Sequence, residues 1–393
     1  MPHRPDPARQ LLALVFGTPG DELSALSASD WAEIDRLANM HKLRPWLAER
    51  WSDSEVPIPS AMCELWSDTR RHAAIAALAQ RAELIAAVKL LDEAGIASVA
   101  LKGPWFAWYA YPAPALRPMN DIDLLVSPDD AARAYELLQG AGFARTRAFE
   151  HGLAEALAHD KHLPQLTSAS GTVIELHMRP WPGPSPRPRD LLARARRMAD
   201  GDPVRYPAAG DLFAHLVIHA AVEGRFDCGA LALLDLDRLL RTETLDWPLL
   251  LGEAQHEGWL RHAALLLALA ERWLRPGLVE ETGCKLRVPA AVVDTAERLM
   301  VQDLETCREA AFLANVAGAA ASGGLLRLGV GKLLGGAATA GEKPASPHKG
   351  SYAGWLSNRL RRHVAAPFNR STREQAAGYR TVLGWCAGAD ARG

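Results

Sequence analysis

The sequence contains little that would mark a secreted, zinc-binding or general nucleic-acid-binding protein. It has only five cysteines among 393 residues, widely scattered and without a CxxC pair, so neither a disulfide framework nor a zinc site is indicated. Its 44 basic and 46 acidic residues give a formal net charge of −2, which excludes the strong basic field of a general nucleic-acid binder. We therefore expect a cytoplasmic protein in a reducing environment, without zinc.

Membrane-targeting signals and several common catalytic motifs are also absent from the sequence. The first residues lack the charged and then apolar pattern of a signal peptide. There is no P-loop, no GxGxxG after a predicted strand and no GxSxG elbow. One apolar stretch, residues 310–341, is interrupted by Arg327 and Lys332. A buried or amphipathic helix is favoured there over a contact with a membrane surface, and we expect no membrane span.

The order of periodic patterns predicts an α+β protein in which helical regions flank a small mixed sheet. Helical spacing of apolar residues dominates before and after the middle of the chain. Between these regions, short apolar or alternating runs predict strands at residues 96–101, 121–126 and 172–177. The predicted organisation has four parts: an N-terminal helical region (1–79), a core (80–190), a C-terminal helical domain (191–340), and a linker with a basic helical tail (341–393).

Local patterns set further boundaries in this organisation. Ser127 and Pro128, followed by two acidic residues, predict a helix that begins at Pro128 and runs to Gln139. Residues 181–190 are rich in proline and predict a loop or linker. Residues 341–350 combine glycine, proline, serine and lysine, which predicts a mobile linker.

Two aspartates in a predicted strand form the most informative pattern of the chain. Asp121 and Asp123 are two residues apart, and side chains alternate along a strand, so both point to the same face. Two carboxylates about 6–7 Å apart repel each other in a dry site, and a divalent cation relieves that repulsion. The pair therefore indicates a Mg²⁺-dependent site for phosphoryl or nucleotidyl transfer. A solvated strand end or a capping pair is the less favoured alternative.

A second polar pair lies in the last predicted strand. Glu175 and His177 share one face of residues 172–177, while the apolar residues share the other. The alternative for Glu175 is the exposed face of an edge strand. His177 would orient a carboxylate, contact the substrate or act as a general base, and a purely structural histidine is an equal alternative. For Lys161 and His162, just before the strand, a solvated loop is favoured over a nucleotide contact.

Taken in order along the chain, these residues resemble a known superfamily. The segments Leu101-Lys102-Gly103, Arg117, Asp121-Ile122-Asp123-Leu124 and Val173-Ile174-Glu175-Leu176-His177 are similar to the DNA polymerase β-type nucleotidyltransferases. The chain looks most like the uncharacterised bacterial nucleotidyltransferase-family proteins within that superfamily. The resemblance covers about residues 80–180, which identifies the predicted core as a nucleotidyltransferase core.

The resemblance implies a site in which carboxylates of a small mixed sheet hold metal ions. Asp121, Asp123 and Glu175 would be the catalytic and metal-binding residues, with Mg²⁺ or Mn²⁺ as the cofactor and an NTP as the substrate. Lys102, Gly103 and Arg117 would bind the nucleotide phosphates, as described next.

The turn at residues 102–104 departs from the superfamily pattern. Gly103 would let the backbone approach a phosphate closely, but Pro104 stands where the superfamily usually has serine or glycine and lacks an N–H. The charge of Lys102 would compensate, and Arg117 would bind the triphosphate or orient a carboxylate. The alternatives are a surface lysine at a strand end and a structural salt bridge from Arg117 to an acid.

The activity implied by the resemblance is transfer of NMP from an NTP to an unidentified acceptor, with release of pyrophosphate. The acceptor would be a small molecule, a peptide, a protein or an RNA end. Two alternatives stay open: a non-catalytic nucleotide-binding or partner-binding module that retains the fold, and a peptide-tailoring enzyme that transfers a phosphoryl group. Fold alone does not decide among them.

Two pairs of polar residues lie in the predicted C-terminal helical domain. His215 and His219 are four residues apart on one helix face, which favours packing or a cleft wall and is compatible with a metal pair. Asp235 and Asp237 are two residues apart on a helix and point to different faces, so a joint metal site is not expected. One of these aspartates would reach an acceptor or cap a neighbouring helix.

Overall fold

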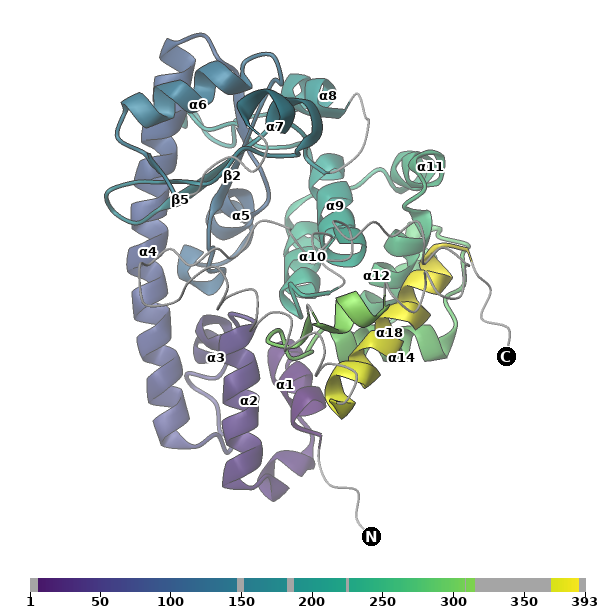
Figure 1. Ribbon diagram of the computed structural model, residues 1–393. Coiled ribbons are helices and arrows are strands. Elements are labelled where there is room, and N and C mark those ends of the chain that lie inside the picture. The colour runs from purple at the N-terminus through teal and green to yellow at the C-terminus, as the bar shows by residue number, and fades with distance from the viewer. Residues whose placement is uncertain are drawn as a thin grey trace.

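A five-stranded mixed β-sheet occupies one end of a largely helical molecule (Figure 1). The computed structural model describes residues 6–146, 152–181, 187–223, 226–307, 309–314 and 369–388. Helices precede the sheet, lie between its strands and follow it. This arrangement confirms the predicted α+β class.

The central strands of the sheet are parallel, and the outer strands are antiparallel to their neighbours. The strand order is β1-β2-β5-β4-β3. The strands are β1 (Ser98–Ala100), β2 (Ile122–Val126), β3 (Ala144–Arg145), β4 (Leu166–Thr167) and β5 (Val173–His177). β2 and β5 pair in parallel with Asp123 opposite Glu175, whereas the other three pairs are antiparallel. The three predicted strands are therefore present. Each begins later than expected, and β1 also ends one residue earlier, at Ala100.

The two faces of the sheet are covered by different helices. On one face, the apolar residues of β2 and β5 are buried beneath α4 (Ser60–Glu93) and α6 (Ala131–Gly140). On the other face, Leu125 belongs to a small apolar cluster with Leu191 of α8 (Arg187–Arg194). Because side chains alternate along a strand, Asp123 shares this second face with Leu125.

The N-terminal helices pack around α4, which runs along one side of the molecule from these helices to the sheet (Figure 1). They are α1 (Pro7–Phe16), a 3₁₀ turn (Asp21–Ala25), α2 (Ala28–Met40) and α3 (Arg44–Arg50). Hydrogen bonds from indole groups link these helices. Trp46 Nε1 donates to the Val15 carbonyl at 2.9 Å, and Trp66 Nε1 of α4 donates to Asp35 Oδ1 at 2.8 Å.

Short helical segments connect the strands. They are α5 (Gly103–Trp105), a π-helix (Phe106–Ala110), a 3₁₀ turn (Pro114–Leu116) and α7 (Leu153–His159). The π-helix packs against α10 (Leu231–Thr242) of the C-terminal helices. The chain that leaves β1 is therefore anchored to a helix more than a hundred residues further on.

The C-terminal helices form a second layer beside the sheet. They are α9 (Ala209–Val217), a π-helix (Ile218–Glu223), α10 (Leu231–Thr242), α11 (Trp247–Glu257), α12 (Leu260–Trp273), α13 (Leu278–Thr282), α14 (Ala290–Leu299) and α18 (Arg370–Cys386). Figure 1 shows α18, in yellow, lying across α14. The last described helix therefore packs back onto the same body.

Two predicted boundaries are wrong. The helix after β2 begins at Ala131 rather than at Pro128, because the preceding residues form a tight turn in which Asp130 N donates to Ser127 O at 3.0 Å. Helix α8 begins at residue 187, inside the segment predicted as a loop, because a proline is tolerated in the first turn of a helix. The predicted domain limits stay predictions, and α4 passes through residues 79 and 80 without a break.

Much of the predicted C-terminal linker and tail lies outside the described residues. The apolar stretch predicted at 310–341 is described only as far as residue 314, and residues 341–350 are not described. Among the described helices, none is both long enough and apolar enough to cross a membrane. All five cysteines are described, and each is a free thiol.

A buried salt bridge joins the sheet to the C-terminal helices. Arg117, which precedes β2, donates to both carboxylate oxygens of Asp235 on α10, at 2.8 and 3.3 Å. The Tyr111 hydroxyl donates to the same carboxylate at 2.9 Å. The side chains of Arg117 and Asp235 are only 13% and 4% exposed. Asp237 instead pairs with Arg241 at 2.9 Å, which confirms that the two aspartates face different ways.

Replacement of the buried aspartate is expected to destabilise the protein. Asp235→Ala leaves Arg117 buried without a counter-charge, so the free energy of unfolding should fall by about 3–5 kcal/mol. Asp68→Ala is the matched control, because Asp68 and its partner Arg71 are 53% and 69% exposed and an exposed pair contributes at most about 1 kcal/mol. Urea denaturation of both variants measures the difference. Equal decreases in the free energy of unfolding would show that the Arg117–Asp235 pair stabilises the protein no more than an exposed pair does.

Candidate active site

The parallel pairing of β2 and β5 brings the polar residues of both strands together. Asp123 is in register with Glu175, and His177 follows on the same face of β5. Neighbouring strands are about 4.8 Å apart, so the two carboxylates are adjacent. Lys102 enters from the end of β1, where Leu101 N donates to the Asp123 carbonyl at 2.9 Å.

Asp123 lies at the centre of this cluster. Lys102 Nζ is 2.8 Å from Asp123 Oδ2, and His177 Nε2 is 2.9 Å from Asp123 Oδ1. Burial acts to raise the pKa of Asp123, but the charges of Lys102 and His177 outweigh it and hold this pKa well below its ordinary value. Asp123 is therefore an ionised carboxylate held between two cations.

Glu175 is held by side chains from β5 and from the hairpin before it. Gln165 Nε2 donates to Glu175 Oε1 at 2.7 Å, and the Nε2 atoms of His177 and His162 lie 3.4 and 3.7 Å from Oε2. Burial acts to raise the pKa of Glu175, but the hydrogen bond from His177 and the charge of His162 lower it overall. Glu175 is therefore ionised as well.

Two of these contacts were not anticipated. Gln165 directly precedes β4, whose antiparallel register with β5 sets it opposite Glu175. Only that register, which no local pattern reveals, would have identified Gln165. The solvated-loop interpretation of His162 is wrong, because its side chain is 15% exposed and its backbone forms an antiparallel bridge with His177.

His177 is a buried cation. Its side chain is 1% exposed, its Nδ1 lies 3.2 Å from the Arg179 carbonyl oxygen, and its Nε2 faces Asp123 and Glu175. All three partners accept hydrogen bonds, so both ring nitrogens carry hydrogen. Burial acts to lower the pKa of His177, but Asp123 and Glu175 more than reverse this effect and raise it to about 9.

Asp121 is the third carboxylate and directly precedes β2. Burial, followed by repulsion from Asp123 and Glu175, raises the pKa of Asp121 to about 6, although Lys102 counteracts part of this increase. The three carboxylates therefore interact with one another, and Asp121 is the one that lacks full compensation.

The residues present fit a divalent cation. Carboxylate oxygens of Asp123 and Glu175 lie within 4.8 Å of each other and of a ring nitrogen of His177. The two carboxylates can hold a metal ion at this spacing, whereas the doubly protonated His177 has no lone pair for it. Carboxylate oxygens suit hard cations such as Mg²⁺ and Mn²⁺. The raised pKa of Asp121 also agrees with a cation site, because a bound cation would offset both the burial and the repulsion that raise this pKa.

The Lys102-Gly103 turn and Arg117 lie side by side next to this cluster. Lys102 has a φ of 39°, a conformation that non-glycine residues rarely adopt. A Cβ on Gly103 would lie 2.6 Å from Met119 Sδ and 3.1 Å from an Arg117 nitrogen, so this close approach requires glycine. Arg117 forms its salt bridge with Asp235, which was its structural alternative. The phosphate contacts predicted for Lys102, Gly103 and Arg117 stay predictions.

His215 and His219 bring the C-terminal helices to the edge of the cluster. The His215 ring is buried, with its centroid 6.0 Å from that of Trp181, and its Nδ1 has no hydrogen-bond partner in the described part of the chain. Burial holds the pKa of His215 well below its ordinary value, whereas the charge of Lys102 is the main cause for His219. Lys102 is therefore close enough to both rings for its charge to act on them. The role of the two histidines, in packing or in a cleft wall, stays a prediction.

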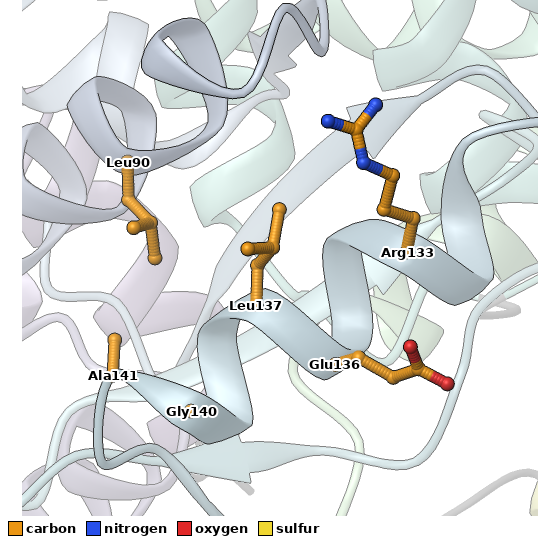
Figure 2. Close-up of a pocket in the computed structure, with 6 residues that line it drawn as sticks. All are labelled: Leu90, Arg133, Glu136, Leu137, Gly140 and Ala141. Atoms are coloured by element: carbon orange, nitrogen blue, oxygen red, sulfur yellow. The ribbon is translucent and has the colours of Figure 1, made fainter.

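A separate hollow of about 410 Å³ lies between α4 and α6 (Figure 2). Figure 2 shows Leu90 and Leu137 projecting from these two helices into the space between them. The hollow is lined by Leu90, Arg133, Glu136, Leu137, Gly140 and Ala141. None of the predicted site residues lines it, so it is distinct from the acidic cluster.

Comparison with known proteins agrees with this geometry. A family model described as an uncharacterised nucleotidyltransferase matches residues 27–275. A search of curated proteins found no match. The matched segment contains α2, α3, the whole sheet and α9 to α12, so it includes every charged residue of the cluster. Because this match covers more than half of the chain, the protein belongs to the uncharacterised nucleotidyltransferase family.

Proposed function

We propose that the protein is a metal-dependent nucleotidyltransferase that moves NMP from an NTP to an acceptor and releases pyrophosphate. The observation that carries this proposal is the convergence of Asp121, Asp123 and Glu175 on one sheet face, with Lys102 and His177 as fixed cations between them. Membership of the family supports nucleotidyl transfer in general.

Asp121, Asp123 and Glu175 would hold Mg²⁺ or Mn²⁺. A divalent cation bound there would stabilise the negative charge of the triphosphate and of the departing pyrophosphate. His177 would orient the two strand carboxylates, because its Nε2 lies 2.9 Å from Asp123 Oδ1 and 3.4 Å from Glu175 Oε2. A doubly protonated imidazole has no lone pair to accept a proton, so this orienting role fits better than that of a general base.

Lys102, Gly103 and Arg117 would bind the phosphates. Lys102 places a charge directly at Asp123, and the absence of a side chain at Gly103 lets Met119 and Arg117 pack closely against the backbone of the turn. Arg117 lies against Gly103 but is also bound to Asp235, so its main contribution would be to fix the turn in place. The helix face that carries His215 and His219 would form the wall of the acceptor site.

Loss of one metal-binding carboxylate is expected to abolish most turnover. Asp123→Asn should reduce pyrophosphate release by about 100-fold or more, because metal-ion stabilisation of phosphoryl charge contributes several kcal/mol. The assay uses purified protein with each of the four NTPs and with Mg²⁺ or Mn²⁺. Asp129→Asn is the matched control, since Asp129 lies six residues further on and its side chain is 80% exposed.

The outcomes of this assay separate the three candidate activities. Pyrophosphate release that Asp123→Asn removes and Asp129→Asn retains supports nucleotidyl transfer. A product that gains one phosphate instead of a nucleotide identifies phosphoryl transfer. Nucleotide binding without any turnover by the wild-type protein identifies a non-catalytic module, provided that thermal unfolding shows the protein to be folded.

The orienting role of His177 leads to a spectroscopic prediction. His177→Gln is expected to weaken Mg²⁺ and Mn²⁺ binding by similar factors of about 10–100, the typical effect of removing a group that orients metal ligands. Pulsed electron paramagnetic resonance of bound Mn²⁺ should show no directly coordinated nitrogen in the wild-type protein. His256→Gln, at an exposed position of α11, is the control. A nitrogen coupling that disappears in His177→Gln would instead make the imidazole a metal ligand.

A further inference from the structure

Lys42 is a lysine of the N-terminal helices that lies beside the acidic cluster. It occupies the turn between α2 and α3 with a φ of 58°, in the left-handed region that non-glycine residues rarely adopt. Two backbone hydrogen bonds close this turn, from Lys42 N to Asn39 O at 3.1 Å and from Leu43 N to Ala38 O at 2.7 Å. Such a conformation persists where the surrounding structure imposes it.

Contacts of the neighbouring residue fix the turn against the C-terminal part of the chain. His41 Nε2 lies 3.0 Å from the Gln302 carbonyl oxygen. A Cβ on Gly229 would lie only 2.4 Å from His41 Nδ1, so the loop before α10 passes directly over the His41 ring. The position of Lys42 is thus set by packing on both sides.

Packing of α3 also places the turn near the segment that leads into β2. Helix α3 contacts the 3₁₀ turn at Pro114–Leu116, directly before Arg117. The Trp46 ring of α3 lies edge-on to Tyr111, with ring centroids 5.9 Å apart. Lys42, two residues before α3, therefore approaches the same segment that leads into Asp121.

Three cations, Lys42, Lys102 and Arg117, are close enough for their charges to act on one another, and two of them are paired with carboxylates. Lys102 pairs with Asp123 at 2.8 Å, and Arg117 pairs with Asp235 at 2.8 Å. In the described portion of the chain, the ammonium group of Lys42 has no ion pair or hydrogen bond. Its side chain is nevertheless half-buried.

An unpaired cation in this position is electrostatically unfavourable. Burial and then the nearby charge of Arg117 lower the pKa of Lys42 to about 8, although Asp121 acts to raise it. Burying a charge without a partner costs free energy. An anion bound directly to Lys42 would remove this cost, which Asp121 offsets only in part.

We propose that Lys42 binds the phosphate groups of the nucleotide, so that the N-terminal helices form one wall of the nucleotide site. This inference rests on the proposed function and adds a phosphate-binding residue from outside the sheet core. A lysine ammonium is a compact point charge that suits phosphate oxygens. The ligand class is a polyphosphate anion, in which the phosphates rather than the base contact Lys42.

The test is calorimetric binding of ATP and of inorganic tripolyphosphate, with Mg²⁺, to the full chain. Lys42→Met should weaken both affinities by about tenfold to a hundredfold, the effect of losing one hydrogen bond to a charged group. Lys42→Arg keeps the charge in the same backbone conformation and should retain most of the affinity. Lys89→Met, at an exposed position of α4, is the matched control and should bind like the wild type.

A second charge-removing variant distinguishes a loss of phosphate binding from misfolding of the variant. Asparagine tolerates the left-handed region better than most residues, so Lys42→Asn should fold and show the same loss as Lys42→Met. In steady-state assays both variants should raise KM more than they lower kcat. Equal loss in Lys42→Arg would indicate a structural role and overturn the proposal.

The failure of this inference is distinguishable from failure of the proposed function. If the wild-type protein binds neither ATP nor tripolyphosphate, both are overturned. If the wild type binds ATP and Asp123→Asn abolishes its turnover, but Lys42→Met binds as tightly as the wild type, only the role of Lys42 is overturned.

Discussion

The crowding of three carboxylates on one face of the sheet is the constraint on which the rest of the structure depends. The parallel register of β2 and β5 leaves Asp123 and Glu175 side by side, with Asp121 next to them. Like charges at this spacing repel, and burial without partners would add a penalty of several kcal/mol per ion. Two fixed cations offset this penalty: Lys102 from the end of β1 and His177 from β5 itself. This arrangement keeps ionised oxygens concentrated in one place, which is what binding of a divalent cation requires.

The same constraint accounts for the meeting of distant parts of the chain at this edge of the sheet. Arg117 adds another largely buried positive charge, and α10 supplies Asp235 to balance it. On the opposite side, the turn between α2 and α3 brings Lys42 close to Asp121 and Arg117. The N-terminal helices, the sheet and the C-terminal helices thus each contribute charged groups to one cluster. The family match agrees with this view, because it begins directly before α2 and ends after α12 instead of being confined to the sheet.

The sequence was informative about what is local and uninformative about which segments become neighbours. Strand periodicity alone predicted that Glu175 and His177 share a face, because alternation of side chains is a local property. Gln165 reaches Glu175 only through the register of a hairpin, and Lys42 reaches the cluster only through the packing of α3. The partner of Arg117 lies 118 residues further along the chain, so no spacing rule identifies it. Helix starts were misplaced by a few residues, because the first turn of a helix accepts several hydrogen-bond patterns.

The charges around the cluster also link the binding of metal and nucleotide in the proposed reaction. Three carboxylates face the cations Lys42, Lys102 and His177, so the cluster is close to neutral without ligands. A divalent cation alone adds positive charge beside Lys42, and a polyphosphate alone brings negative charge toward Asp121 and Glu175. Each ligand therefore lowers the electrostatic penalty of binding the other, and this coupling is reciprocal by thermodynamic linkage. Metal and nucleotide should accordingly bind as a pair, and the turn that carries Lys42 becomes part of that coupling as well as part of the packing between helices.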